Sequence, residues 1–407
     1  MKIRVGVIFG GESVEHEVSI ITAVQAMENF DYDKYEVVPI YIAKDRVWYT
    51  GELLKDIENY TDLDNLKRYA KKVTLTYQKG RYVLQSIGFF KRIIDEIDVA
   101  CPLMHGANGE DGSIQGYLEM LGIPYTGCNV YGAALGQDKV LMKQIFEANH
   151  LPITKYVWFF ENEYRSNSNA ILEKIEKLKY PVIVKPATLG SSVGITRVTK
   201  PETLESAIED AMQYDKKIVV EEVVQNLMEV NCSVLGNYEY QETSEIDEII
   251  NDSEFLSYED KYMAGGKKMG GKLSKTGAKG SMKGGSKGMQ SADRIIPARI
   301  SDELRKEVRN VSKECFRVLN LEGISRIDFL IDKKKNKVYI NEPNTIPGSL
   351  AFYLWLPVGK SYTELLDDYI NLAIKRHKKR GKTVFSFETN ILQYNGLKGA
   401  KGIKGKL

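Results

Sequence analysis

The chain has 407 residues, of which 43% are hydrophobic and 28% are charged, and its formal net charge is +2. This composition excludes a disordered chain, and the lack of any apolar run of about 20 residues excludes a transmembrane helix. The N-terminus lacks the apolar stretch of a secretory signal, and the four cysteines lie too far apart for a zinc ribbon or a disulfide framework. We therefore expect a cytoplasmic globular protein of about two or three domains.

The positive charge is concentrated in two segments that are rich in glycine and lysine. Residues 264–288 contain seven lysines and residues 396–407 contain four, and neither segment contains an acid. The rest of the chain is therefore acidic, which argues against nucleic-acid binding as the main function. We expect no nucleic-acid partner and no membrane partner.

Strands and helices alternate along the chain, which predicts the α/β or the α+β class. The sequence opens with a strand at Ile3–Phe9, a Gly10-Gly11 turn and a helix from about Ser19, as in a doubly wound α/β domain. We expect this domain to end near Leu135. Its further elements are strands at Glu36–Ile42, Val99–Met104 and Ile123–Thr126, and a helix at Gln115–Leu121.

The remainder of the chain continues the alternation of strands and helices. The expected strands are Val182–Pro186, Lys217–Val223, Glu229–Leu235, Ser325–Ile331 and Lys337–Glu342. The expected helices are Lys139–Ala148, Thr203–Tyr214, Ser301–Leu319 and Tyr362–Arg376.

Three glycine-rich loops follow predicted strands, where α/β folds place their binding sites. They are Gly10–Ser13, His105–Gly116 and Lys185–Gly194. Glycines let an anion approach backbone N–H groups, and Lys185 adds a positive charge. The loop His105–Gly116 is also dense in polar groups, for which a polar surface turn is the alternative interpretation. None of the three matches a dinucleotide fingerprint or a Walker A loop.

Two adjacent predicted strands carry polar side chains on one face. Arg326 and Asp328 alternate along one strand, and Glu342 and Asn344 alternate along the next. Their apolar neighbours indicate burial, and a buried acid needs a partner or a metal. Two carboxylates and an amide oxygen suit Mg²⁺, whereas a cross-strand pair of arginine and aspartate is the structural alternative.

Taken in this order, the motifs resemble the D-alanine–D-alanine ligase family of the ATP-grasp superfamily, from Val5 to about Arg376. The motifs that carry the resemblance are GGxSxEHEVS (Gly10–Ser19), HGxxGEDGxxQG (His105–Gly116), YTGC (Tyr125–Cys128), ALGxDKxLMK (Ala134–Lys143), VKPxxxGSSVG (Val184–Gly194), RIDF (Arg326–Phe329) and NExNTxPG (Asn341–Gly348).

The resemblance implies an N-terminal Rossmann-like domain followed by a two-part ATP-grasp fold of the α+β type. The expected divisions are 1–135 for the first domain, 136–223 for the central subdomain, 224–380 for the catalytic domain with a lid insertion at 263–291, and 381–407 for an extension and basic tail. The implied activity is ATP-dependent formation of D-alanyl-D-alanine through an acylphosphate, for peptidoglycan synthesis in the cytoplasm. It also implies two Mg²⁺ ions, with Mn²⁺ as a substitute, and a homodimer.

The resemblance also implies roles for single residues, with Glu15 holding the ammonium of the first D-alanine and Arg326 and the Gly348 N–H stabilising the tetrahedral species. The expected substrate-binding residues are Glu15, His105, Tyr262 and Ser349. Those for ATP are Lys139, Lys185, Ser191, Glu221, Glu222, Val224, Glu229 and Lys261. The expected metal ligands are Asp328, Glu342 and Asn344, and the expected catalytic residues are Glu15, Ser191, Arg326 and Gly348.

The segment Ser349–Pro357 departs from the family pattern, which usually has a Thr-Ser run and a later serine for the carboxylate of the second D-alanine. Here the only hydroxyl side chains are those of Ser349 and Tyr353. The second substrate is therefore left open between D-alanine, D-serine, a D-hydroxy acid such as D-lactate, and another amine. The long lysine-rich lid is either a cationic cover for the ATP phosphates or a simple insertion. A nucleotide-binding regulatory protein is the alternative from another functional class.

Overall fold

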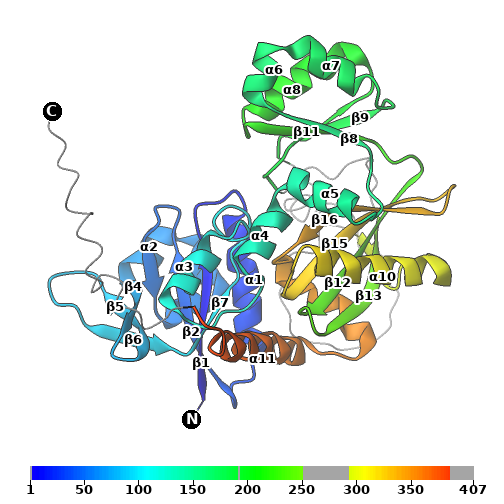
Figure 1. Cartoon of the computed structure of the whole chain (residues 1–407). Coiled ribbons are helices and arrows are strands. Elements are labelled where there is room, and N and C mark those ends of the chain that lie inside the picture. The colour runs from blue at the N-terminus through cyan, green and yellow to red at the C-terminus, as the bar shows by residue number, and fades with distance from the viewer. Residues whose placement is uncertain (1, 191–192, 251–292, 386–407) are drawn as a thin grey trace, which may run out of the picture.

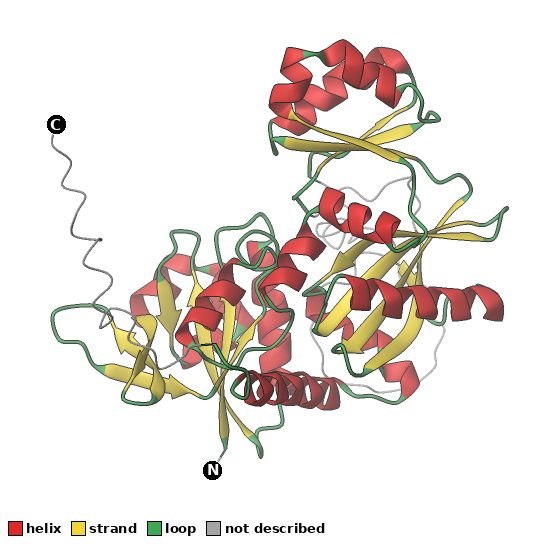
Figure 2. Ribbon diagram, viewed as in Figure 1, coloured by secondary structure: helices red, strands yellow, loops and turns green. Residues whose placement is uncertain are grey.

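The computed structural model describes residues 2–190, 193–250 and 293–385 of the chain. These residues form three sheets, each accompanied by helices (Figures 1 and 2). The sheets follow one another along the chain, at 3–102, 156–222 and 227–344. The expected α/β architecture is therefore confirmed, whereas the exact domain boundaries stay predictions.

The first sheet has seven strands in the order β6-β5-β4-β3-β2-β1-β7. Strand β1 pairs in parallel with both β2 and β7, and the remaining pairs are antiparallel. This parallel core places the loops after β1 and β7 at one edge of the sheet, as a Rossmann-like fold does. The strands are β1 Ile3–Gly10, β2 Tyr35–Ile42, β3 Trp48–Thr50, β4 Lys71–Gln78, β5 Arg81–Ser86, β6 Ile93–Ile97 and β7 Val99–Pro102, and the helices are α1 His16–Asn29, α2 Leu63–Tyr69 and α3 Ser113–Leu121.

Helices α4 (Val130–Gln137) and α5 (Lys139–Ala148) lead into the second, smaller unit, a four-stranded antiparallel sheet of order β10-β9-β11-β8. Three helices cover one face of this sheet, and the unit stands at the top of Figure 2. Its strands are β8 Tyr156–Phe160, β9 Val182–Pro186, β10 Thr196–Val198 and β11 Lys217–Glu222, and its helices are α6 Glu161–Ser166, α7 Ser168–Ile175 and α8 Leu204–Met212.

The third sheet is antiparallel and has the order β14-β13-β12-β15-β16. Helix α10 packs on one face, where Val308, Cys315 and Phe316 join the apolar strand residues in one core. Helix α11 returns instead to the first sheet, since Leu365, Tyr369 and related residues share a core with β1 and α1. The elements are β12 Leu227–Gly236, β13 Gln241–Ile250, β14 Asp293–Ile295, β15 Gly323–Asp332, β16 Lys337–Asn344, α10 Asp302–Val318 and α11 Tyr362–Arg380.

Two expectations about local structure are wrong. Helix α1 begins at His16 rather than near Ser19. The segment Ile123–Thr126 is not a strand, because it makes only one bridge, between Tyr125 and Ala100. The antiparallel strands β3 to β6 were not expected from the sequence at all. Within the described ranges, no helix combines the length and the apolar character needed to span a bilayer.

Candidate active site

The face of the third sheet near the ends of β15 and β16 carries the predicted acidic cluster. In the antiparallel register Asp328 lies opposite Glu342, and Arg326 lies opposite Asn344. The guanidinium of Arg326 donates two hydrogen bonds to the carboxylate of Asp328, each of 2.7 Å. The amide nitrogen of Asn344 donates to the same carboxylate at 3.0 Å. These four side chains therefore converge on one surface, as their alternation in sequence predicts.

A lysine of helix α5, which leads into the second unit, reaches this surface. Lys139, the first residue of α5, places its Nζ 3.1 Å from Oε2 of Glu342. The same ammonium donates to the carbonyl of Leu189 at 2.7 Å, in the glycine-rich loop after β9. Lys139 thus connects the acidic cluster with the loop that was expected to bind phosphate.

A second charged cluster is buried between the same two units. Glu221, near the end of β11, lies 3.3 Å from Nζ of Lys185 and 3.0 Å from Nζ of Lys143. The Thr154 hydroxyl donates to it at 2.8 Å. Burial alone would raise the pKa of Glu221, but the two lysines and these hydrogen bonds lower it to about 2. The carboxylate is therefore a permanent anion that holds two cations in place.

The other residues expected to bind the nucleotide lie close to one another along the chain. Glu222 ends β11 and accepts a hydrogen bond from the Lys179 N–H at 3.2 Å. Val224 lies in the turn between β11 and β12, and Glu229 lies in β12 opposite Leu330.

Glu15 lies where loops of the first and second units meet. A Cβ atom on Gly106 would lie 2.6 Å from Oε2 of Glu15, and one on Gly190 would lie 3.3 Å from the same oxygen. Any larger residue at Gly106 would collide with the carboxylate, and its φ of +69° also favours glycine. The glycines of both loops therefore allow the backbone to approach Glu15 closely.

Glu110 joins the first unit to the third. Its carboxylate accepts from the Gly106 N–H at 3.0 Å, from the Ile346 N–H at 2.9 Å and from the Thr345 hydroxyl at 3.2 Å. Burial and the nearby charge of Glu15 raise the pKa of Glu110 to about 7. The carboxylate of Glu110 thus holds the loop after β7 against the loop after β16, and it does so close to the second acid, Glu15.

His105 belongs to the same contact between units. Its Nε2 lies 2.9 Å from the Thr22 hydroxyl of α1, and that hydroxyl oxygen accepts from the Ser349 N–H at 3.1 Å. Burial and the positive charge of Arg326 lower the pKa of His105 to about 4, although a backbone hydrogen bond to Ile346 acts to raise it. His105 is therefore a neutral imidazole at pH 7.

The segment that follows the acidic cluster has an unusual backbone. Ser349, Leu350 and Ala351 all have φ near +50°, although none is glycine. Such strain in successive residues persists only where the surroundings fix it, and it is typical of functional loops. The Ser349 hydroxyl is buried and donates to the side chain of Gln25 in α1. Gly348, whose N–H was expected to stabilise the tetrahedral species, begins this segment.

Three expected site residues, Ser191, Lys261 and Tyr262, and the lid at 263–291 lie outside the described residues. Conversely, four residues that contribute to the site, Thr22, Glu110, Lys143 and Thr154, were not singled out in the sequence. A signal existed for Lys143, because it lies four residues after Lys139 and so shares its helix face. Glu110 stands in the motif HGxxGEDGxxQG but has no role assigned from the sequence, and no local pattern identifies Thr22 or Thr154.

Asp328, Glu342 and Asn344 could together hold a hard cation. They offer two carboxylates and one amide oxygen, which is the number of protein ligands that Mg²⁺ takes when substrate phosphates complete its shell. Within the described ranges, no three or more histidine, cysteine, aspartate or glutamate side chains are arranged to hold a metal by themselves. The donor set thus fits a metal that arrives with a phosphate ligand.

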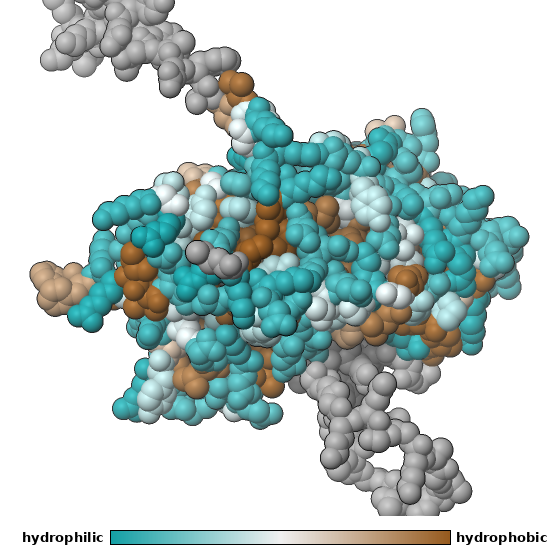
Figure 3. Space-filling view, turned by 90° about the horizontal axis from the view of Figure 1, so that it is seen from below, coloured by the Kyte–Doolittle hydropathy of each residue, from teal (hydrophilic) through white to brown (hydrophobic). Residues whose placement is uncertain are grey.

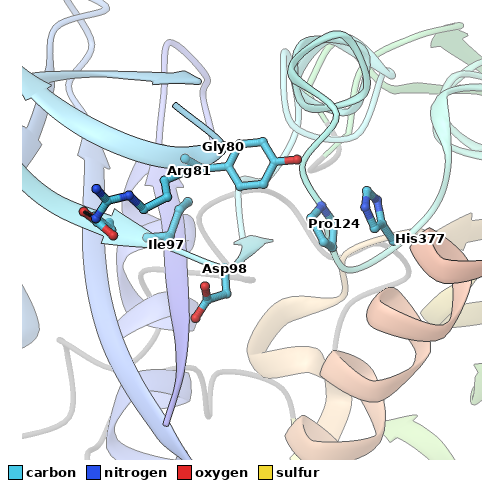
Figure 4. Close-up of a pocket in the computed structure, with 8 residues that line it drawn as sticks. Gly80, Arg81, Ile97, Asp98, Pro124 and His377 are labelled. Carbon is cyan, nitrogen blue, oxygen red and sulfur yellow. Dashed lines mark hydrogen bonds and ion pairs between the residues drawn. The ribbon is translucent and has the colours of Figure 1, made fainter. Parts of the chain in front are cut away.

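A cavity of about 190 Å³ lies outside this region, at the edge of the first sheet. Figure 4 shows Arg81, Ile97 and Asp98 on one side of it. On the other side lie Pro124 and, from helix α11, His377. None of the site residues described above lines it, so we do not assign it to the active site.

Comparison with known proteins decides the family. The description "D-ala D-ala ligase N-terminus" matches residues 4–128, and "D-ala D-ala ligase C-terminus" matches residues 145–276 and 282–371. The chain belongs to the D-alanine–D-alanine ligase family. Members of this family are ATP-dependent, ADP-forming ligases.

Full-length relatives agree with this membership. The chain is 38% identical over 394 residues to a D-alanine–D-alanine ligase of Thermosipho melanesiensis, covering 96% of this chain and 98% of that one. It is 39% identical to one of Thermoanaerobacter pseudethanolicus, with 93% and 98% covered.

Solved structures of the family are also similar. The ligase of Coxiella burnetii is 26% identical with a TM-score of 0.76, and the alignment covers 94% of this chain and 96% of that one. The VanG D-Ala:D-Ser ligase from Enterococcus faecalis is 29% identical with a TM-score of 0.74, with 92% and 100% covered.

Proposed function

We propose that the protein joins two molecules of D-alanine for peptidoglycan synthesis, with ATP as the energy source. The γ-phosphoryl group passes to a carboxylate oxygen of the first D-alanine, giving an acylphosphate and ADP. The amine of the second D-alanine then attacks the acyl carbon and phosphate leaves, which forms the peptide bond. The observation that carries this proposal is the convergence of Arg326, Asp328, Glu342, Asn344 and Lys139 on one surface between the units, in a chain of this family.

Glu15 binds the ammonium of the first D-alanine in this proposal. The carboxylate lies between the glycine-rich loops of two units, where a small amino acid can contact both. A cation bound there would also relieve the repulsion between Glu15 and Glu110. His105 stays neutral and, through Thr22, aligns the loop that begins at Gly348.

The nucleotide binds between the second and third units. Lys139 and Lys185 bind its phosphates, with Ser191 and Lys261 as further contacts. Glu221 accepts from the adenine amine, the backbone of Glu222 and Val224 contacts the base, and Glu229 binds the ribose. The support for this placement is the pair of buried lysines around Glu221 and the contact of Lys139 with both the loop carbonyl and Glu342.

Mg²⁺ would be held by Asp328, Glu342 and Asn344, with Mn²⁺ as a substitute. When bound, the metal neutralises negative charge on the phosphates during transfer. Two groups of the chain itself act at the same place. The guanidinium of Arg326, oriented by its two hydrogen bonds to Asp328, and the Gly348 N–H face the developing oxyanion. Tyr262 completes the substrate site in this proposal.

The carboxylate of the second D-alanine needs a new partner, because the Ser349 hydroxyl is committed to Gln25. Tyr353 supplies a hydroxyl that is buried and has no hydrogen-bond partner among the described residues. Burial and the charges of Asp247 and Asp328 raise the pKa of Tyr353, whereas those of Arg294 and Arg326 lower it. Two arginine–aspartate pairs therefore lie near this hydroxyl. Arg294 stacks on the ring at 4.8 Å from its centroid. We therefore assign the acceptor carboxylate to Tyr353 and these arginines.

The acceptor assignment predicts a selective effect of Tyr353→Phe. Loss of one hydrogen bond to a charged group costs about 1.5–3 kcal/mol, so KM for the second D-alanine should rise roughly 10- to 100-fold. KM for ATP and for the first D-alanine should stay unchanged. Tyr362→Phe is the matched control, because its hydroxyl is also buried and unpartnered but lies in the core of the first sheet. Equal KM values in wild type and Tyr353→Phe would contradict the assignment.

The proposed function is tested by phosphate release from Mg·ATP with D-alanine, with L-alanine in parallel. We expect release with D-alanine only, and a dipeptide of the corresponding mass. Glu342→Gln should abolish this turnover while the unfolding curve stays close to that of wild type. Turnover by Glu342→Gln at the wild-type rate would remove the metal assignment, and no release with D-alanine would contradict the function. Release that appears only with D-serine or D-lactate as acceptor would identify the other substrate class.

We also propose that the enzyme works in the cytoplasm as a homodimer built through the first domain. The support is the membership of a family with this organisation, and sedimentation equilibrium of the purified chain tests it. A mass of one chain at micromolar concentration would contradict the dimer.

A further inference from the structure

The hairpin that joins β5 and β6 ends in exposed apolar side chains. Phe89 is 94% exposed and Phe90 is 74% exposed, and Ile87 and Ile93 beside them are also exposed. The two rings meet edge to face with their centroids 5.2 Å apart. Neither ring belongs to any hydrophobic core that the described residues form. In Figure 3 this hairpin end projects from the body as a pale-brown knob.

The backbone of the hairpin end is held by hydrogen bonds at its base. Ser86 Oγ accepts from the Arg92 N–H at 2.9 Å and donates to the carbonyl of Phe90 at 3.2 Å. The Ser86 N–H donates to the carbonyl of Arg92 at 2.9 Å, and the Ile87 N–H donates to that of Lys72 at 3.2 Å. The rings are therefore presented to solvent by a structured turn.

Exposed cations lie in the hairpin end and on the strand beside it. Lys91 and Arg92 follow the phenylalanines, and Lys71 and Lys72 come from the adjacent strand β4. All four are exposed, and none forms an ion pair with a described residue. The acids nearest in the chain, Asp95 and Glu96, are already paired with Arg4 and Arg81. The hairpin end thus combines exposed aromatic rings with unneutralised positive charge.

We propose that this hairpin end docks on a membrane surface that carries anionic lipids. Aromatic side chains favour the interface between headgroups and acyl chains, and lysine and arginine beside them are attracted to anionic headgroups. A second copy of the chain is a less suitable partner, because a two-fold contact at this hairpin end would bring the same four cations of each copy together. The sequence predicts no membrane partner because it contains no transmembrane segment. The present proposal concerns surface docking, and it rests on cations that two strands bring together only in the fold.

Vesicle sedimentation of the full-length protein tests this proposal. We expect the wild-type protein to pellet with vesicles of phosphatidylcholine and phosphatidylglycerol, to stay in solution with phosphatidylcholine alone, and to be released by salt. Phe89→Ser/Phe90→Ser should weaken the binding at least tenfold. Lys91→Glu/Arg92→Glu should do the same, since each cation near an anionic leaflet contributes about fivefold.

Matched controls separate the site from general surface effects. Tyr131→Ser removes another ring that is 74% exposed, and Lys174→Glu/Lys177→Glu makes the same charge change in α7 and the turn that follows it. Both should bind vesicles as wild type does. Absence of wild-type binding to anionic vesicles, or equal binding by the hairpin variants, would overturn the proposal. Conversion of a dimer to a monomer by Phe89→Ser/Phe90→Ser, without vesicle binding by wild type, would assign the surface to a second copy instead.

Discussion

Glu221 and Glu110 carry the same carboxylate in opposite electrostatic surroundings. Burial alone would raise the pKa of Glu221, but Lys143 and Lys185 lower it to about 2. At Glu110, burial and the neighbouring acid Glu15 act in the same direction and raise the pKa to about 7. The comparison teaches that neighbouring charges, rather than residue type, decide whether a carboxylate of this site is a permanent anion.

The difference matches the two halves of the proposed reaction. Around Glu221 one carboxylate and two lysines are in place before any substrate arrives, and their net positive charge suits a nucleotide. Glu15 and Glu110 repel each other, so a bound ammonium would improve the energy of the site. The charges around Glu221 thus hold one another without a ligand, whereas the repulsion at Glu110 would be relieved by the ammonium of a substrate.

The largest expected effect comes from removing the charge of Glu221. Glu221→Gln leaves Lys143 and Lys185 as buried cations without an anion, and such a change costs about 3–5 kcal/mol in the free energy of unfolding. Urea denaturation at pH 7.5 measures it. Glu147→Gln, on the exposed face of α5, is the control and should change stability by less than about 0.5 kcal/mol. Equal stabilities of the two variants would show that the lysines are not held by Glu221.

An intermediate effect is expected from pH. The pKa of Glu110 is raised above its ordinary value of 4.5, so the folded state holds this proton more tightly than the unfolded state does. The extra stability is present below about pH 4.5 and is lost as the pH rises through about 7. The difference in unfolding free energy between wild type and Glu110→Gln should therefore shrink by about 1–3 kcal/mol from pH 5 to pH 8. A difference that stays constant across this range would contradict the raised pKa.

The smallest expected effect on stability is that of Glu110→Gln at pH 8. The amide loses hydrogen bonds to a charged acceptor, but it also removes repulsion from Glu15, so the net change should be within about 1 kcal/mol. KM for the first D-alanine should nevertheless rise several-fold, because the link to Ile346 and Thr345 is weakened. Steady-state kinetics with both D-alanine sites resolved measures this. A loss of stability as large as that of Glu221→Gln would contradict the difference proposed between the surroundings of Glu110 and Glu221.

The sequence predicted the acidic cluster well because it depends on local rules. Arg326 and Asp328 alternate on one strand, and Glu342 and Asn344 alternate on the next, so side-chain direction follows from strand geometry alone. The antiparallel register of β15 and β16 then brings the two pairs together. Lys185 stands out because it ends a strand next to a glycine-rich loop, whereas Lys139 is assigned only through the resemblance to the family.

The rest of the fold and site depends on contacts that no local pattern reveals. Strands β3 to β6 were not expected, since β3 has only three residues and β6 has mostly part-exposed positions. Glu110 and Ile346 are 236 residues apart in sequence, and Thr22 and Ser349 are 327 apart. The hydrogen bond from the Ser349 hydroxyl to Gln25 could not be foreseen either. It occurs in a segment where three successive residues have positive φ, which the sequence does not indicate.

The most direct test of the proposed chemistry follows one oxygen atom. D-alanine labelled with ¹⁸O in its carboxylate is incubated with the enzyme and Mg·ATP, and the released phosphate is analysed by mass spectrometry. When the acylphosphate reacts, one carboxylate oxygen of the first D-alanine leaves with the phosphate. We therefore predict one ¹⁸O atom in each phosphate and one remaining ¹⁸O atom in the peptide carbonyl. Unlabelled phosphate released together with dipeptide would contradict the acylphosphate and with it the roles assigned to this site.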